Sequence, residues 1–160
     1  MRAIVLAVAF LAGPAYADLR GHVASVHNGD TITLLVDGIQ VRVRLIDIAA
    51  PELAQPFGKR SWQSLARICS GQDARVSVRG KDRNARTFGQ VTCGVVDANA
   101  EQVRRGMAWV FVRAPKRSAL HQFQNEAQLE RRGLWSDAHQ PVPPWEWRLR
   151  HRDRSARPLL

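Results

Sequence analysis

An alternating run of residues, 31–48, constrains the fold of this chain more than any other stretch. Its first part is β-branched and apolar, and Asp37-Gly38 then forms a strong signal for a two-residue hairpin turn. The part after this turn alternates apolar residues with Arg42 and Arg44, which is the period of a half-buried strand. The run therefore predicts two antiparallel strands, residues 31–36 and 39–48.

Other segments complete a small mixed fold. Strand composition recurs in three more places, residues 22–26, 75–78 and 89–96. Helical spacing, caps and terminal glycines predict three helices, residues 58–70, 99–105 and 118–132. Five strands, the first three in a meander, together with three helices predict an α+β fold around a five-stranded barrel.

Two of the predicted helices carry an apolar stripe that we assign to the core rather than to a binding function. In the first helix the stripe consists of Trp62, Leu65, Ala66 and Cys69. In the last helix it consists of Leu120, Phe123 and Ala127. Asn99 is the expected N-cap of the middle helix.

The N-terminus has the pattern of a secretory signal peptide. Arg2 precedes an apolar run at residues 3–12, Gly13-Pro14 breaks that run, and Ala15-Tyr16-Ala17 is a small-x-small cleavage signal. The run is too short to cross a bilayer, which needs about 20 residues. The alternative is a buried N-terminal strand. We expect residues 1–17 to be a signal peptide, and the mature chain to be secreted or periplasmic without an integral membrane segment.

The two cysteines, Cys69 and Cys93, both lie in the mature part. Two cysteines without a CxxC motif do not supply a tetrahedral zinc site. In an oxidising compartment the simplest use is a disulfide, which would close a loop of about 25 residues and stabilise the fold by about 3.5 kcal/mol in the chain-entropy model. The alternative is two buried thiols that do not meet.

The chain is strongly basic. Its formal charge is +10, and loss of residues 1–17 removes one arginine and leaves +9. Arginine matches phosphate bidentately, so the charge is consistent with nucleic acid, anionic lipid or acidic polysaccharide as a partner. Charge alone does not separate these three.

A change of composition divides the mature chain. Residues 18–138 suit one domain with one modest core. Residues 139–160 form a basic tail rich in proline, tryptophan and arginine, in which Trp145 and Trp147 are placed to dock back on the domain. We expect disorder after about Arg148.

Four charged residues lie at strand ends or in tight loops: Asp30, Arg44, Glu52 and Arg86. Phosphodiester hydrolysis needs a carboxylate that holds a cation, a second carboxylate that activates or positions water, and arginines that stabilise charge on the phosphoryl oxygens. These residues cover each role if the fold brings them together. Each residue also has a purely structural explanation. Asp30 could brace its turn, and Arg44 could be a solvated strand residue. Glu52 could cap the approach to the helix, and Arg86 could be one charge among many in its loop.

Four segments follow one another in the order and at the spacing of the staphylococcal nuclease (thermonuclease) family: HNGDT, VRLIDIAAPEL, DRNARTFGQV and NAEQVRRGMAWV. The resemblance covers about residues 21–135. It implies an OB-type five-stranded barrel with three helices, and a monomeric endonuclease that hydrolyses DNA or RNA with calcium.

The resemblance also implies roles for single residues. Asp30 stands at the calcium-binding aspartate, and the backbone carbonyl of Ala50 stands at a second calcium ligand. Arg44 and Arg86 stand at the two arginines that act on the phosphate. Glu52 stands at the glutamate that positions or deprotonates the attacking water. The expected substrate-binding residues are Lys81, Arg83 and Phe111.

Two departures from the family pattern bear on activity. The family's second calcium aspartate is Ala49 here, and Asp47 lies too far along an extended strand, about 6.6 Å for two residues, to replace it directly. Asp47 is therefore expected to contribute through a bridging water, or if the end of the strand shifts. The family also stacks bases on tyrosines, but the mature chain has none: Asn84 stands in place of one, and Phe111 is the nearest aromatic substitute.

Three classes of function remain open at this stage. The first is a secreted thermonuclease-like phosphodiesterase whose metal site is weakened by Ala49. This site would bind calcium with a dissociation constant on the order of millimolar or weaker. The second is a catalytically weak or inactive module that binds nucleic acid through its arginines. The third is an accessory protein for another polyanion, such as acidic polysaccharide or the envelope surface.

Overall fold

The structure, a computed structural model, describes residues 18–82, 86–116, 118–136 and 141–155, with side chains up to His151. The predicted signal peptide, Arg83 and Asn84 lie outside the described residues. Five long strands form a closed barrel in the order β3-β2-β1-β5-β6, and a parallel pairing of β3 with β6 closes it. These strands are β1 (Leu19–Asn28), β2 (Thr31–Val36), β3 (Ile39–Leu45), β5 (Asp73–Lys81) and β6 (Thr87–Cys93).

The predicted meander is confirmed. β1 pairs with β2 and β2 pairs with β3, both antiparallel. Asp37 and Gly38 have φ angles of 48° and 80°, as a two-residue turn with two left-handed residues requires. The barrel interior is filled by alternate apolar residues of these strands, with Ile32, Leu34 and Val43 fully buried.

The third strand is shorter than predicted. β3 ends at Leu45, and the chain turns at Asp47, where φ is 62°. A left-handed residue breaks the extended conformation, so the following residues leave the barrel. They form β4 (Ile48–Ala49), which pairs with the equally short β8 (Trp109–Val110) in a separate two-stranded sheet. The remaining short strand, β7 (Val96–Asp97), extends the barrel sheet beside β6.

Helix α1 (Gly58–Cys69) covers one end of the barrel and is tied to it covalently. A disulfide joins Cys69 at its last turn to Cys93 at the end of β6, which confirms the predicted pairing. The predicted apolar stripe is partly wrong. Leu65 and Cys69 are buried, but Trp62 is 38% exposed and its indole N–H donates to the backbone oxygen of Val26. Small buried serines and Ile68 fill the face where Trp62 was expected.

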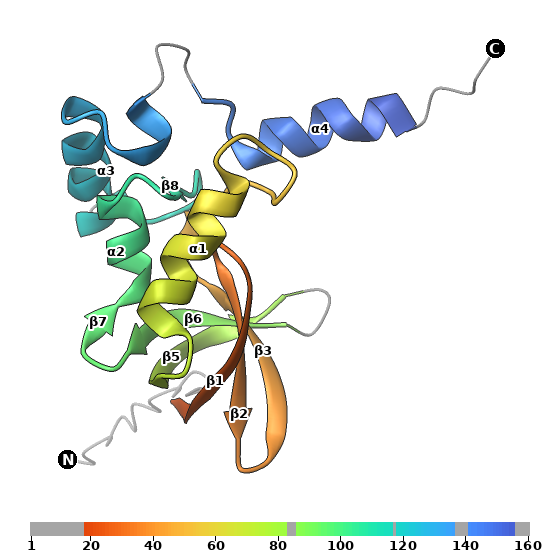
Figure 1. The fold of residues 1–160 in the computed structure, drawn as a ribbon, viewed down its shortest axis with the longest axis vertical. Coiled ribbons are helices and arrows are strands. Elements are labelled where there is room, and N and C mark those ends of the chain that lie inside the picture. Colours follow the sequence, from red (N-terminus) through yellow and green to blue (C-terminus); the bar gives the residue numbers. More distant parts are fainter. Residues whose placement is uncertain (1–17, 83–85, 117, 137–140, 156–160) are drawn as a thin grey trace, which may run out of the picture.

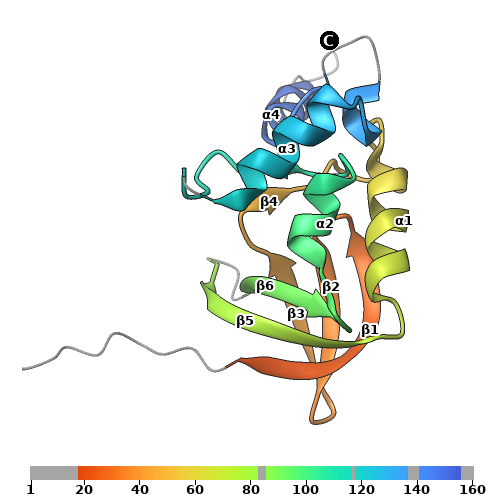
Figure 2. The ribbon, with the colours of Figure 1, turned by 90° about the vertical axis from the view of Figure 1, so that its left-hand side faces the viewer.

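The other helices lie on the same side of the barrel as α1 (Figures 1 and 2). They are α2 (Ala98–Arg104), α3 (Ala119–Leu129), the 3-10 turn η1 (Gly133–Ser136) and α4 (Pro144–Ser155). Helix α3 packs on α2, with Ala127 buried and the Arg104 guanidinium 4.1 Å from the centre of the Phe123 ring. The N-cap of α2 is Asp97 rather than Asn99, because the Asp97 side chain accepts from the amide of Ala100. Asn99 is instead buried.

Helix α4 corrects the expectation of disorder after Arg148, because its described backbone continues to Ser155. The helix extends away from the barrel (Figure 1). Its first residue, Pro144, is buried and has the fixed φ that suits a first helical turn. Within the described residues, the helices are all shorter or more polar than a bilayer-spanning helix has to be.

Candidate functional site

The turn between β1 and β2 directs Asp30 into the molecule. The Asn28 side-chain oxygen accepts from the Asp30 amide at 3.0 Å, which closes the turn locally. Gly29 has no room for a side chain, because a Cβ atom there would lie 1.8 Å from the Ser61 hydroxyl oxygen. Packed in this way, Asp30 is only 4% exposed.

The Asp30 carboxylate contacts two of the other predicted site residues. Its Oδ2 accepts from the backbone amide of Ala50 at 3.1 Å and from the Arg44 guanidinium at 3.5 Å. Its Oδ1 accepts from the Thr31 hydroxyl at 2.9 Å. Strand register explains the approach of Arg44, since Thr31 on β2 lies opposite Arg44 on β3. The structure therefore brings Asp30, Arg44 and Ala50 together.

Gln102 supports the Asp30 turn from the core side, and no motif in the sequence indicated this role. Its side-chain NH₂ donates to the backbone oxygen of Gly29 at 2.7 Å and to that of Ser61 at 3.1 Å. Gln102 is fully buried on α2, so its two hydrogen bonds fix the Asp30 turn against α1 and α2. A polar residue at a core-facing helical position is the signal that would have revealed it.

The donor set around Asp30 does not match a tight calcium site. Calcium binds six to eight oxygen ligands, and its affinity grows with the number of carboxylates. Both Asp30 oxygens already accept hydrogen bonds, and Ala49 is fully buried without a polar side-chain atom. Among the described residues, no three His, Cys, Asp or Glu side chains come together. Ala49 offers no side-chain oxygen here, so a weakened cation site stays a prediction.

Asp47 lies in different surroundings. It lines a groove of about 660 Å³ together with Arg79, Phe88 and Phe123. Burial raises the pKa of the Asp47 carboxyl, and the charge of Arg79 opposes that rise. Its backbone oxygen accepts from the amide of Phe111 at 2.8 Å. The structure groups Asp47 with Arg79, so a water-mediated role near Asp30 stays a prediction.

Glu52 meets a partner that the sequence did not indicate. Its Oε1 accepts from the Arg148 guanidinium of α4 at 2.5 Å. The Glu52 backbone is held by Gln55, whose side-chain oxygen accepts from the Glu52 amide at 3.2 Å. Gln55 also donates its side-chain NH₂ to the backbone oxygen of Val142. Residues 96 positions apart thus meet at the predicted general base.

Arg86 stands just before β6 and is held by Asp82. Its Nε donates to Asp82 Oδ2 at 2.7 Å. Two further bonds close the same loop: the Arg86 amide donates to Asp82 Oδ1, and the Asp82 amide donates to the Arg86 carbonyl. The parallel register places Arg44 opposite Phe88, two residues beyond Arg86. Arg86 itself precedes the strand, so this register does not fix its side chain relative to Arg44, and joint action of the two arginines stays a prediction. Lys81 ends β5 on the other side of this loop.

Phe111 packs edge-to-face with Trp145 of α4, with ring centres 6.1 Å apart. The predicted base-stacking residue therefore contacts the C-terminal segment. Base stacking on Phe111 stays a prediction.

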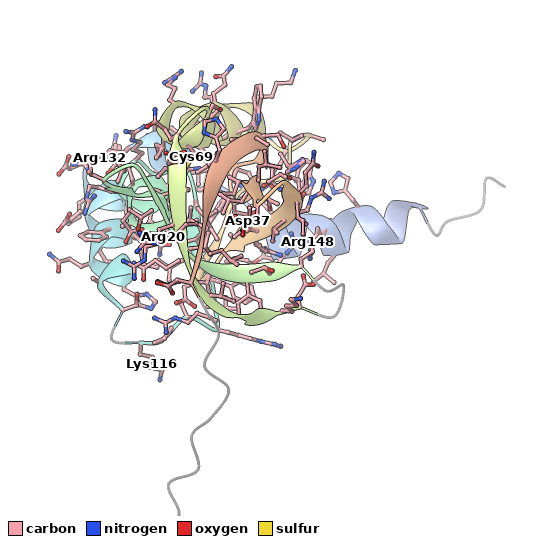
Figure 3. The ribbon with its side chains drawn as sticks, turned by 90° about the horizontal axis from the view of Figure 1, so that it is seen from below. Arg20, Asp37, Cys69, Lys116, Arg132 and Arg148 are labelled. Carbon is pink, nitrogen blue, oxygen red and sulfur yellow. A yellow bond between two sulfur atoms is a disulfide. The ribbon has the colours of Figure 1, made fainter. Side chains whose placement is uncertain are left out.

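Positive side chains are spread widely rather than confined to one face. Arg20, Lys116, Arg132 and Arg148 project from different sides of the domain (Figure 3). Arg148 marks the side from which α4 extends. The positive charge is therefore not concentrated at the groups around Asp30 and Glu52.

Comparisons with known proteins cover nearly the whole chain. The family described as "Staphylococcal nuclease homologue" matches residues 42–137. The chain is 42% identical to "Protein ParB" of Escherichia coli, over 95% of this chain and 92% of that protein. It is 38% identical to "Micrococcal nuclease" of Shigella flexneri, over 92% of this chain and 91% of that protein. It is 41% identical to an "Uncharacterized endonuclease" of Escherichia coli O157:H7, over 84% and 88%. The matched family range contains Arg44, Glu52 and Arg86, whereas Asp30 precedes it and Arg148 follows it.

Proposed function

The chain belongs to the staphylococcal nuclease homologue family, and on that premise we propose that it hydrolyses phosphodiester bonds in DNA or RNA as an endonuclease. The observation that carries the proposal is the contact of Arg44 with the Asp30 carboxylate at the end of two paired strands. Glu52 lies two residues after Ala50 in the chain, and the Ala50 amide donates to the Asp30 carboxylate. The relatives named as nucleases support the same reaction.

Each charged side chain has one task in this proposal. Arg44 and Arg86 bind the phosphoryl oxygens and stabilise the charge that develops on them. Glu52 accepts a proton from the attacking water. Since Oε1 of Glu52 accepts from Arg148, we assign the water to Oε2. Lys81, Arg83 and Phe111 extend the substrate contact along the chain.

A weakened metal site is part of the proposal. When bound in this family, calcium polarises the phosphoryl oxygen. Here Asp30 and the Ala50 carbonyl would hold it, with Asp47 only through water. One carboxylate gives an affinity on the order of millimolar or weaker. We therefore expect slow hydrolysis that responds only to high calcium.

We also propose that the protein acts as an exported monomer. The Cys69–Cys93 disulfide supports an oxidising compartment, secreted or periplasmic. The signal-peptide pattern of residues 1–17 agrees with it. Equilibrium sedimentation tests the monomer. Localisation of the tagged chain in a host with an oxidising periplasm tests the export.

The test of the hydrolase is cleavage of labelled single-stranded and duplex DNA and RNA, with calcium titrated to tens of millimolar and with chelator. We expect slow cleavage that Glu52→Gln and Arg44→Ala each reduce at least a hundredfold. Glu146→Gln, an exposed acid on α4, serves as the matched control and should leave the rate unchanged. Absence of cleavage with every divalent metal tried would overturn the hydrolase proposal.

One observation favours a second function, a nucleic-acid-binding module without useful catalysis. The charged groups of the site are already paired inside the molecule, Glu52 with Arg148 and Arg86 with Asp82. In this reading the arginines bind phosphate backbones, and affinity falls steeply with salt through counterion release. Binding that is insensitive to salt argues against it. Displacement of DNA by heparin at equal charge concentration would instead indicate a general polyanion binder.

A further inference from the structure

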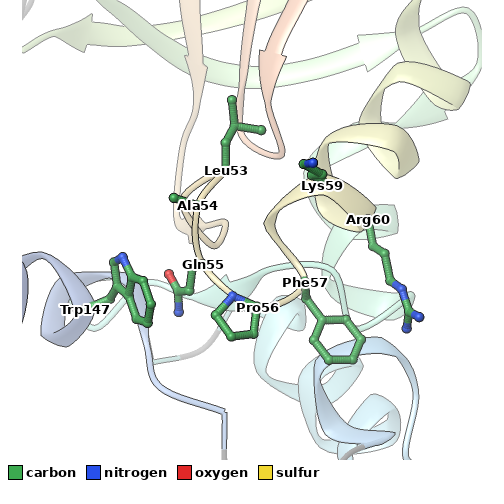
Figure 4. Close-up of a pocket in the computed structure, with 8 residues that line it drawn as sticks. All are labelled: Leu53, Ala54, Gln55, Pro56, Phe57, Lys59, Arg60 and Trp147. Carbon is green, nitrogen blue, oxygen red and sulfur yellow. The ribbon is translucent and has the colours of Figure 1, made fainter.

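A groove of about 870 Å³ opens beside Glu52, between the loop that follows it and helix α4 (Figure 4). Its walls include apolar, aromatic and cationic side chains: Leu53, Pro56, Phe57, Lys59, Arg60 and Trp147. In Figure 4, Trp147 and the pair Phe57 and Arg60 lie on opposite sides of Pro56. None of the residues lining it is acidic. Trp147 lies outside residues 42–137, the range that matches the family. One wall of this groove is therefore contributed by a segment beyond that range.

The loop that forms the groove is held rigidly. The amide of Gln55 donates to the Glu52 carbonyl at 2.8 Å, and the amide of Gly58 donates to the Gln55 carbonyl at 2.9 Å. Phe57 has a φ angle of 65°, a conformation that costs energy for a residue with a side chain. Since such strain persists only where packing enforces it, the groove wall is formed before any ligand arrives.

Trp147 presents an aromatic surface to this groove. One face of its indole stacks on the His151 ring, with ring centres 4.0 Å apart and planes at 25°. The indole also lines the groove next to Gln55 (Figure 4). A planar aromatic ligand can continue this stack, as bases do on tryptophan in single-strand binding proteins.

The opposite side of the groove carries positive charge that no acid among the lining residues offsets. Lys59 and Arg60 stand in the first turn of α1, where the helix dipole is also positive, and that turn contains no acid. Phe57 at the N-cap position makes no side-chain cap. The Arg60 guanidinium lies 5.0 Å from the centre of the Phe57 ring, which holds it over the groove wall. An anion next to these groups relieves their mutual repulsion.

On the premise of the hydrolase proposed above, we propose that this groove binds one unpaired nucleotide of a single-stranded substrate, next to the phosphate that meets Glu52. The base stacks on Trp147, and its phosphate lies against Lys59 and Arg60. The combination of a flat aromatic wall and a cationic wall matches a base and its phosphate. A base pair inside a duplex cannot stack in this way without opening, so the groove selects single strands.

The contact between α4 and Glu52 keeps the groove in place. Arg148 follows Trp147 directly and binds Glu52, and Gln55 binds the Val142 carbonyl just before α4. The same helix therefore delivers the stacking residue and a partner of the proposed base. The subsite and the hydrolytic group are adjacent because one helix contacts both.

The experiment measures binding of a fluorescein-labelled twelve-residue thymidine oligonucleotide to the full chain in chelator, where cleavage does not interfere. We expect Trp147→Ala to weaken binding about tenfold. Leu149→Ala, an exposed apolar residue on the same helix, is the matched control. We expect Arg60→Ala to reduce the slope of log affinity against log salt by about 0.7. Arg67→Ala, at the other end of α1, is its control.

A second measurement avoids dependence on the fold of a variant. Oligonucleotides that carry 5-iodouracil are irradiated with the unaltered protein, and the cross-linked peptide is identified by mass spectrometry. We expect cross-links to Trp147 or Phe57. Cross-links found solely at other aromatic residues overturn the subsite, as does equal binding by Trp147→Ala and Leu149→Ala. If Trp147→Ala weakens the binding of duplex DNA as much as the binding of the single strand, the proposed selectivity for single strands is overturned.

These outcomes separate the subsite from the hydrolase. Cleavage that proceeds normally while Trp147→Ala and Arg60→Ala match their controls removes the subsite and leaves the hydrolase. Cross-linking at Trp147 without cleavage at any metal concentration removes the hydrolase and leaves the subsite as part of a binding module.

Discussion

The two sides of the candidate site are built in different ways. On the barrel side, the Asp30 turn is held by buried hydrogen bonds, and Gln102 secures it from inside the core. On the α4 side, Glu52 is held by an ion pair in which both side chains are more than one third exposed. Buried hydrogen bonds are costly to lose, whereas exposed ion pairs contribute little. The barrel side is therefore secured from the core, whereas the α4 side depends on weaker contacts at the surface.

The strongest challenge to this comparison is Gln102→Leu. It leaves the buried carbonyl of Gly29 without its donor and removes the second donor to Ser61, whose carbonyl also belongs to the α1 hydrogen-bond ladder, so we expect the free energy of unfolding to fall by about 2 kcal/mol. Urea denaturation measures the loss. Gln128→Leu, at an exposed position of α3, is the control. A loss below about 1 kcal/mol would mean that the Asp30 turn is not secured from the core.

Ala49→Asp tests the missing calcium ligand on the barrel side. An aspartate at this fully buried position, close to Asp30, should destabilise the metal-free protein by about 1–2 kcal/mol. Calcium should restore the stability through binding to the folded state and raise the cleavage rate. Thermal unfolding with and without 10 mM calcium measures the stability, and cleavage of labelled DNA under the same two conditions measures the rate.

Ala49→Asn has the same shape without the charge and should gain nothing from calcium. If the original chain is stabilised by calcium as strongly as Ala49→Asp, then Ala49 does not weaken the site.

Arg148→Gln tests the α4 side, where we expect a much smaller change. Loss of an exposed ion pair with Glu52 should reduce the free energy of unfolding by about 0.5 kcal/mol. Hydrogen exchange in α4 should nevertheless become faster, because the helix loses one of its few attachments. Exchange measured by mass spectrometry on α4 and on β2 compares the two sides in one sample. A global loss above about 2 kcal/mol would show that α4 is integral to the fold.

Asp47→Asn should give the smallest change of the four, and this change should be an increase in the free energy of unfolding. Burial raises the pKa of Asp47, so the folded state favours the protonated acid, and this preference is lost as pH rises through the folded pKa. At pH 7 the charged form is therefore unfavourable, and asparagine should stabilise the protein by a few tenths of a kcal/mol. Near pH 3, where the acid is protonated in both states, the gain should disappear.

Asp37→Asn is the matched control, since Asp37 also has a left-handed φ but is exposed. Denaturation at pH 7 and pH 3 compares the pair. A loss of calcium-dependent cleavage in Asp47→Asn would instead assign Asp47 to the metal.

The parts of the fold that depend on local pattern were predictable. Alternation and the Asp37-Gly38 turn predicted the β2–β3 hairpin, and cysteine count with compartment predicted the disulfide. The break after β3 was not predictable, because the left-handed φ of Asp47 leads into a pairing of β4 with β8, which come from distant parts of the chain. Trp62 was misplaced because its exposed indole gains a hydrogen bond to β1 that periodicity does not show.

The sequence by itself determined the family and the barrel, because these follow from short motifs and local periodicity, and the same motifs predicted roles for Asp30, Arg44, Glu52 and Arg86. The same sequence showed that Ala49 replaces a carboxylate. Only the tertiary structure decided which charges meet. Gln102 reaches Gly29 across 73 positions, and Arg148 reaches Glu52 across 96. Contacts between residues so far apart depend on how whole elements pack, and no local pattern encodes that packing.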